Sequence, residues 1–174
     1  QTDAAHLCVA GHSRLGKTAL VTGAFDERFT AAYSNDSGCS GAAISRGKVG
    51  ESIEVISRVF PFWFCKGYRK YAENEYNAPF DQHTLLSLIA PRRIYVASAQ
   101  LDEWADPESE FLACAAVNEV YELYGLKGLV HANRLPEAGD ALHKGNVAYH
   151  MRSGTHYFSR TDWLYFMEYF KGIE

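Results

Sequence analysis

The chain has 174 residues, of which 47% are hydrophobic and 14% aromatic, and its formal net charge is −4. This composition predicts a folded globular chain rather than a disordered one, with enough residues for one domain with a sizeable core. No block of Lys or Arg stands out and no apolar run is long enough to span a bilayer, so neither nucleic acid nor a membrane is expected as a partner.

The first element in chain order is a strand that turns directly into a helix. Leu7 to Ala10 is a short apolar run typical of a buried strand, and Gly11 to Ser13 is a turn. From Arg14 onward the apolar residues have helical spacing, up to Gly23. A serine at the apex of such a turn is typical of a nucleophile elbow, which holds the hydroxyl at the carboxyl end of a sheet in front of a helix amino terminus.

The same residues also match a phosphate-binding motif. Residues 11–18, GHSRLGKT, fit the P-loop pattern G-x-x-x-x-G-K-[ST] at every position. In the elbow pattern G-x-S-x-G, by contrast, the last glycine is displaced by one residue to Gly16. The pattern alone favours the P-loop, because its match is complete. A third interpretation is that Gly11 and Gly16 only allow close packing of strand and helix.

A second buried strand is expected at Phe29 to Ser34, followed by turn composition from Asn35 to Gly41. Asp36 therefore follows a strand end, and in parallel α/β sheets ligands and catalytic groups gather at that edge. A lone Asp in a turn more commonly forms an Asx turn or caps a helix. Asp36 is thus a candidate acid with a structural alternative.

Residues 42–91 contain no clear strand. A short helix is expected from Glu51 to Arg58, and another from His83 to Ala90, which Pro91 stops. Between them, residues 60–65 form an aromatic cluster that is expected to be core or the wall of a groove. A long insertion of this kind between strands often builds a substrate-binding wall.

The clearest later strand is Arg92 to Ser98. Asp106 beyond it is a good N-cap, because Pro107 occupies the first helical position. Asp102 has no such duty and follows the strand end directly. A helix is expected over Glu108 to Leu123. Its core face is expected to carry Phe111, Leu112, Ala115, Ala116 and Val120.

The end of the chain is expected to complete the sheet. Leu129 to Leu135 is expected to be a strand or a covering segment, and Asn146 to Arg152 is the last strand. Ser153 to Tyr157 is a glycine-containing loop, and Thr161 or Asp162 is expected to cap a final helix. The inward face of that helix is expected to carry Leu164, Phe166, Met167 and Phe170.

Ser13, an acid and a histidine each follow a strand end, in the chain order of the α/β-hydrolase triad. A serine hydroxyl needs a general base, and the base needs a carboxylate to orient it. Of the seven histidines, only His156 lies in a loop between the last strand and the last helix. Asp36 also fits the magnesium-binding acid of a P-loop protein, but that interpretation leaves Asp102 and His156 unexplained.

Several segments together form a specific pattern. They are GHSRLGKTAL at 11–20, SNDSGC at 34–39, FPFWF at 60–64, DQH at 81–83, LIAP at 88–91, WADP at 104–107 and the block 156–163. With these segments the chain resembles, over nearly its whole length, the glucuronoyl esterases of carbohydrate esterase family 15, particularly the bacterial members. The elbow of that family has the form G-x-S-R-x-G-K, which makes the P-loop match accidental.

The resemblance implies roles for individual residues. Ser13 matches the nucleophile of the family and His156 matches the base. Arg14 matches the residue that stabilises the oxyanion. Lys17 matches a lysine that binds the uronate sugar, and Trp104 matches the tryptophan that lines the sugar site.

The family places the triad acid at one of two positions. Many members have a Glu where this chain has Asp36, and others have an Asp where this chain has Asp102. Because Asp36 is one methylene shorter than Glu, we predict Asp102 as the acid and keep Asp36 as the second candidate. The sugar-contacting Gln of the family is not evident near Arg58 and Val59.

The resemblance also implies the fold. It predicts the carboxyl-terminal half of an α/β-hydrolase fold, a mostly parallel sheet flanked by helices, as a single partial catalytic domain over residues 1–174. The strands that precede the elbow strand in this fold are absent from the sequence.

The expected activity is that of a serine-type carboxylic ester hydrolase. Its substrate would be the 4-O-methyl-glucuronoyl esters that link glucuronoxylan to lignin, cleaved without a metal or organic cofactor. By family resemblance the protein would be secreted or periplasmic. An acetyl xylan or other carbohydrate esterase is the alternative in the same class, and a P-loop nucleotide-binding protein is the alternative in another class.

Overall fold

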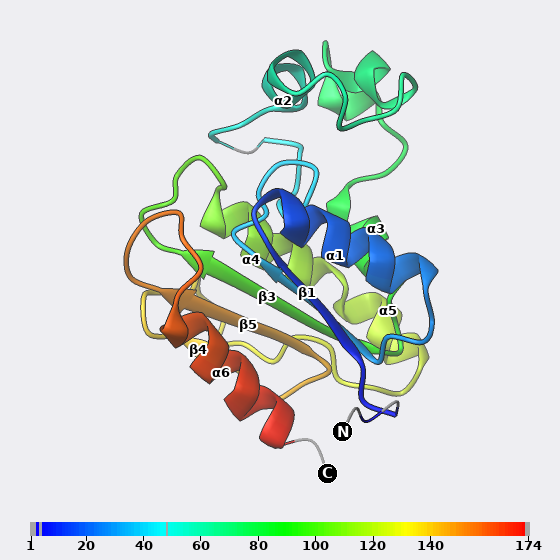
Figure 1. Cartoon of the computed structure of the whole chain (residues 1–174). Helices are drawn as coiled ribbons and strands as arrows, with labels where there is room; N and C mark the ends of the chain where they lie inside the picture. The colour runs from blue at the N-terminus through cyan, green and yellow to red at the C-terminus, as the bar shows by residue number, and fades with distance from the viewer. Residues whose placement is uncertain (1–2, 4, 48, 173–174) are drawn as a thin grey trace.

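The computed structural model describes residues 3, 5–47 and 49–172, and its centre is a five-stranded sheet in the order β1-β2-β3-β5-β4 (Figure 1). The parallel strands are β1 (Cys8–His12), β2 (Ala31–Asn35), β3 (Arg93–Ala99) and β5 (Val147–Arg152). The short β4 (Ala141–Leu142), which the sequence did not predict, pairs with β5 in antiparallel fashion. All four parallel strands therefore end at the same edge of the sheet.

Helices cover both faces of this sheet (Figure 1). One face packs against α1 (Arg14–Phe25), α3 (Gln82–Ser87), α4 (Pro107–Ala116) and α5 (Asn118–Leu123), and the other against α6 (Arg160–Lys171). Neighbouring strand residues point to opposite faces. Ile94 of β3 accordingly packs in one cluster with Leu20 of α1 and Phe111 of α4. The next residue, Tyr95, packs with Phe166 of α6.

The segment between β2 and α3 extends beyond the sheet (Figure 1). It contains α2 (Ile53–Val59) and two short 3₁₀ helices, η1 (Tyr68–Tyr71) and η2 (Glu75–Asn77). A small apolar cluster of its own, which includes Cys39, Ile53 and Ile56, holds it together. The absence of a strand from residues 42–91, expected from the sequence, is confirmed for the described part of that segment.

The helix expected over residues 108–123 is wrong in one respect, because it is two helices that meet at Val117. The Asn118 side chain donates to the Leu129 carbonyl at 3.0 Å and accepts from the Leu129 amide at 2.6 Å. Of the two alternatives for residues 129–135, a strand or a covering segment, the strand is not formed, apart from a single bridge between Leu129 and Val147. The observed core residues of this region are Phe111, Ala113, Cys114, Val117 and Tyr121, whereas Leu112 and Ala116, expected on the core face, are exposed.

The expected cap of the last helix is also wrong. The N-cap of α6 is Ser159, whose hydroxyl accepts from the Asp162 amide, while the Asp162 carboxylate accepts from the Ser159 amide in a capping box. The buried residues of α6 are Asp162, Phe166 and Tyr169, and Phe170, expected to be inward, packs partly buried against the same cluster. Leu164 and Met167, expected to be inward, are exposed.

Other local predictions are confirmed. Asp106 caps α4 by accepting from the Ser109 amide, and Pro107 is the first helical residue. Within the described residues, no helix has the length and apolar character needed to cross a membrane.

Candidate active site

Ser13 is a single-residue turn between a strand and a helix. β1 continues to His12 and α1 begins at Arg14, so the turn is shorter than the sequence predicted. Ser13 has φ 58° and ψ −126°, a conformation that non-glycine residues rarely adopt and that a well-packed surrounding must impose. The strand thus delivers the hydroxyl to the carboxyl edge of the sheet, as a nucleophile elbow does.

The two glycines of the elbow are required by close packing. A Cβ at Gly11 would lie 2.0 Å from the Leu15 carbonyl oxygen, and one at Gly16 would lie 2.9 Å from the Ser37 Cβ. The helix begins at the fourth residue of the P-loop pattern, so the loop that would surround a phosphate does not form. The Lys17 ammonium instead donates to the carbonyls of Ser37 and Cys39, at 2.7 Å for Cys39. The P-loop interpretation is therefore wrong.

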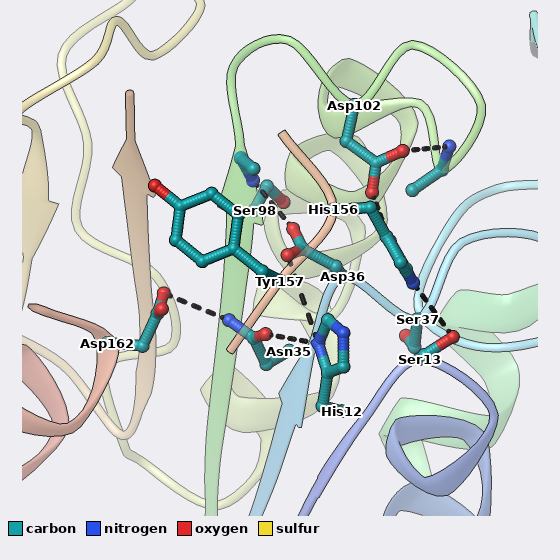
Figure 2. A network of polar contacts seen from close by, with 12 residues as sticks. His12, Ser13, Asn35, Asp36, Ser37, Ser98, Asp102, His156, Tyr157 and Asp162 are labelled. Carbon is teal, nitrogen blue, oxygen red and sulfur yellow. Dashed lines mark hydrogen bonds and ion pairs between the residues drawn. The ribbon is translucent and has the colours of Figure 1, made fainter. Parts of the chain in front are cut away.

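The structure brings three of the candidate residues into one chain of hydrogen bonds. Figure 2 shows His156 between Asp102 and Ser13. Its Nε2 lies 2.9 Å from Ser13 Oγ, and its Nδ1 lies 2.6 Å from Asp102 Oδ2. The other Asp102 oxygen accepts from the Ala105 amide at 3.3 Å, which fixes the carboxylate. The arrangement fits a serine activated by a histidine that a carboxylate orients.

Asp36 lies close by but is used differently. Its Oδ1 accepts from the Ala99 amide at 2.7 Å and its Oδ2 from Arg152 Nη2 at 3.1 Å. Burial, with Glu110 adding and Arg152 opposing, raises the pKa of Asp36 to about 9. A carboxyl group that keeps its proton is a poor partner for a histidine that must become positive. The geometry favours Asp102 over Asp36 as the partner of His156.

A pocket of about 340 Å³ opens in front of the serine. It is lined by the expected residues Ser13, Lys17, Asp36, Asp102, Trp104 and His156 and by Ser37, Gly38, Glu51, Phe60, Trp63 and Ala105. Arg14 is not among them; its guanidinium lies 5.9 Å from the centre of the Trp63 ring. The backbone of Arg14 stays beside Ser13, in the first turn of α1.

Comparisons with known proteins show to which family the chain belongs. A family model described as "Glucuronyl esterase, fungi" matches residues 1–125. This chain belongs to the glucuronoyl esterase family. The match covers the elbow, both acid positions and the aromatic segment, so the family predicted from the sequence is confirmed.

Individual members of the family are similar to this chain in sequence and in structure. A carbohydrate esterase, MZ0003, from an unknown prokaryotic organism is 45% identical over 97% of the chain and 39% of its own length. A 4-O-methyl-glucuronoyl methylesterase from Hypocrea jecorina is 32% identical over 71% of the chain and 28% of its own length. The solved glucuronoyl esterase from Solibacter usitatus is 44% identical, with a TM-score of 0.90 over 98% of this chain and 43% of that chain. The α/β-hydrolase fold is thereby confirmed, over about two fifths of the length of the curated relative MZ0003.

The aromatic cluster expected as core or a groove wall contributes Phe60 and Trp63, which stack with ring centres 3.9 Å apart and form one wall of the pocket in this glucuronoyl esterase chain. Glu51, by contrast, was not expected from the sequence. Glu51 is buried in the segment between β2 and α3, where its amide donates to the Trp104 carbonyl at 3.1 Å. Only the tertiary fold brings residue 51 to the loop that carries Trp104, so no local signal could have found it.

His12 is a further residue beside the glucuronoyl esterase site. Its ring centre lies 4.6 Å from that of His156, and the ring also stacks on Phe158. The Nδ1 of His12 lies 2.7 Å from Asn35 Oδ1 (Figure 2). Burial lowers the pKa of the ring. A neutral His12 supports the His156 ring and does not repel it when His156 becomes positively charged.

A metal site is not preformed here. Among the described residues, one group of three, Asp36, Asp102 and His156, has possible ligand atoms within 4.8 Å of one another. Both ring nitrogens of His156 already have partners in Ser13 and Asp102, and both oxygens of Asp36 accept hydrogen bonds. A cation would have to break the hydrogen-bond chain through His156, so the donor set fits acid–base chemistry better than metal binding.

Proposed function

We propose that this chain supplies the catalytic residues of a serine-type hydrolase that cleaves glucuronoyl esters. The observation that carries the proposal is the hydrogen-bond chain from Ser13 through His156 to Asp102, which opens into a pocket. Ser13 is the nucleophile, His156 the general base and Asp102 the acid that orients it. Membership in the glucuronoyl esterase family supports the ester as substrate.

The reaction follows from the positions of these groups. His156 Nε2 takes the proton of Ser13 as the oxygen attacks the ester carbonyl. Asp102 stabilises the imidazolium that results. When the tetrahedral intermediate collapses, His156 gives the proton to the leaving alcohol and the acyl group stays on Ser13. A water molecule, deprotonated by His156, then attacks the acyl-enzyme, and His156 returns this proton to Ser13 Oγ as the uronic acid is released.

The negative oxygen of the intermediate needs donors at the helix start. The amides of Gly16 and Lys17 donate to the Ser13 carbonyl at 2.9 and 3.3 Å, within the first turn of α1. The amide of Arg14 comes earlier, where a helix offers no backbone acceptor. We assign the oxyanion to this backbone N–H and to the positive end of the α1 dipole. The Arg14 guanidinium is placed to support Trp63, which it contacts through a cation–π interaction.

The acyl side of the substrate would occupy the pocket beside Lys17 and Trp104. Both residues line it, and the Trp104 side chain is half exposed at its rim. A uronate ring offers hydroxyls for the lysine and a flat face for the indole. The methylesterase name of the Hypocrea jecorina relative supports a 4-O-methyl-glucuronoyl group on the acyl side. The leaving group would be a lignin alcohol, as the resemblance in sequence implies.

The experiment compares two esters on the intact protein. Benzyl glucuronate places the sugar on the acyl side, whereas an acetylated xylose places only a methyl group there. We expect kcat/KM for the glucuronate ester to exceed that for the acetyl ester by about 10²-fold or more, because a site built to bond hydroxyls loses affinity when they are missing. Preference for the acetyl ester would favour an acetyl xylan esterase instead.

A further inference from the structure

His156 lies on a loop that needs support of its own. Residues 153–159 connect β5 to α6 outside any helix or strand, and the His156 side chain is 45% exposed. The bonds from His156 to Ser13 and Asp102 can persist only if the loop keeps one conformation. The residue before the loop is Arg152, the last of β5, which is buried.

The Arg152 guanidinium binds the loop on both sides of His156. Nη1 donates to the Ser153 carbonyl at 3.0 Å, and Nη2 donates to the Thr155 carbonyl at 3.1 Å and to the Tyr157 carbonyl. The guanidinium carbon also lies 4.0 Å from the centre of the Tyr157 ring. One planar group thus binds carbonyls immediately before and immediately after the histidine.

The same guanidinium is anchored to two other elements. Nε donates to both carboxylate oxygens of Asp162 on α6, at 3.0 and 2.9 Å. Nη2 donates to Asp36 at the end of β2. Although burial opposes it, hydrogen bonds from His150 and Ser159 and the charge of Arg152 lower the pKa of Asp162, so this carboxylate balances the buried arginine.

We propose that Arg152 is the positioning residue of the general base, which joins the His156 loop to α6 and to the end of β2. This inference rests on the proposed function, in which His156 is that base. It also gives Asp36 a role as an acceptor for Arg152 rather than for His156. A misplacement of a reacting group by 1 Å costs roughly 10²-fold in rate, so a loosened loop would lower turnover.

Arginine suits this task for a geometric reason. Its planar fork directs five N–H groups outward in fixed directions, whereas lysine is a point charge on a flexible stem. Arg152→Lys therefore keeps the charge opposite Asp162 but cannot bind the carbonyls of Ser153, Thr155 and Tyr157 together. The substitution therefore tests the hydrogen-bonding geometry of the guanidinium separately from its positive charge.

Replacing an arginine that only stabilises the fold should lower stability but not the catalytic rate. Arg92 is a matched control of this kind. Arg92 also donates to several carbonyls, those of Gly23, Asp26, Phe29 and Leu88, at the opposite end of the sheet. Arg92→Lys should lower the unfolding free energy without touching the site. The two variants thus separate positioning from general stability.

The experiment measures Arg152→Lys and Arg92→Lys in the intact protein by three readouts. They are urea unfolding, kcat and KM for benzyl glucuronate, and the rate at which a fluorophosphonate labels Ser13, which needs His156 but no sugar. For Arg152→Lys we expect kcat and the labelling rate to fall about 10–100-fold with KM changed less than about twofold. Arg92→Lys should keep kcat and the labelling rate of the parent.

Each outcome has a separate meaning. Labelling of Arg152→Lys at the parent rate would overturn the positioning role. A parent that is labelled at Ser13 but does not cleave glucuronate esters would contradict the proposed substrate, and the labelling rates would still test Arg152. No label on parent Ser13 would overturn both. If Arg152→Lys does not fold, Arg152→Gln with Asp162→Asn leaves no unpaired buried charge and should fold with the same slow labelling.

Discussion

At the scale of single residues, two carboxyl groups near His156 have different surroundings. Asp102 bonds directly to His156 Nδ1 at 2.6 Å. Asp36 faces the Ala99 amide and Arg152, and its pKa is raised by burial. The first is placed to hold the imidazolium, and the second to hold the backbone around it.

The two acids should therefore respond differently to the same change. Asp102→Asn should lower kcat/KM by roughly 10²-fold or more, because an amide cannot stabilise the positive His156. Asp36→Asn keeps an oxygen for Arg152 and should cost less than about tenfold. Kinetics of both variants on benzyl glucuronate check this, and equal mild losses would show that the acids substitute for each other.

The raised pKa of Asp36 also makes a prediction about stability. Folded Asp36 holds its proton up to about pH 9, whereas the unfolded chain releases it near its ordinary value of 3.8. The stabilisation is therefore complete below the ordinary value and is lost as the pH rises, by up to about 1.4 kcal/mol per pH unit. Urea unfolding between about pH 5 and about pH 8 should show the parent losing stability relative to Asp36→Asn. A constant difference between the two proteins would mean that folded Asp36 is ionised throughout.

Lys17 tests the sugar site. If its ammonium binds the uronate, Lys17→Ala should lower kcat/KM for glucuronate esters by about 1–3 kcal/mol and leave acetyl esters nearly unchanged. Its bonds to the carbonyls of Ser37 and Cys39 give it a second role, in holding the loop after β2. Equal losses on both esters would assign Lys17 to the loop alone.

Sequence reasoning located some site residues and missed others for a physical reason. Ser13 directly follows β1, and Asp102 and His156 lie in the loops that follow β3 and β5, so the common edge of a parallel sheet brings the three together. Arg152 ends a strand like any other residue, and only the tertiary structure shows which carbonyls its fork reaches. The environment of Asp36 was equally hidden, because burial depends on the whole fold.

At the scale of secondary structure, α6 shows how a local signal can be misplaced. Thr161 and Asp162 were both plausible caps, but the chain uses Ser159, and Asp162 completes the box at the third helical position. The cap matters to the site because α6 carries the carboxylate that anchors Arg152.

Ser159→Ala should therefore destabilise the protein by about 1 kcal/mol, because it removes the acceptor of the Asp162 amide and a donor to its carboxylate. Thr161→Ala is the matched control, since this exposed residue makes no part of the capping box and should cost less than about 0.5 kcal/mol. Unfolding free energies of the two variants check this. A larger cost for Thr161→Ala would restore the cap expected from the sequence.

Most strands and helices could be predicted from the sequence, but breaks caused by distant contacts could not. The apolar runs that became β1, β2, β3 and β5 were all found, with ends that differ by a few residues. The division between α4 and α5 was missed, because it coincides with bonds between the Asn118 side chain and the Leu129 backbone. The pattern of apolar residues carries no sign of such a contact.

At the scale of the whole molecule, the site is formed by the ends of four strands and by the segment between β2 and α3. β1 brings Ser13, β2 brings Asp36, β3 leads to Asp102 and β5 leads to His156. The segment between β2 and α3 adds an aromatic wall to the pocket. The chain spans 39% of the curated relative MZ0003, so the activity proposed here belongs to the intact protein.

The central claim is that Ser13 is a nucleophile in an elbow rather than part of a phosphate-binding loop. Hydrolysis of benzyl glucuronate by the intact protein, its Ser13→Ala variant and its Thr18→Ala variant tests this directly. Thr18 is the matched control, an exposed hydroxyl farther along the same helix that a P-loop would need for its magnesium ion. We predict that Ser13→Ala lowers kcat/KM by about 10³-fold or more and that Thr18→Ala stays within about threefold of the parent. Retained esterase activity in Ser13→Ala would contradict the account.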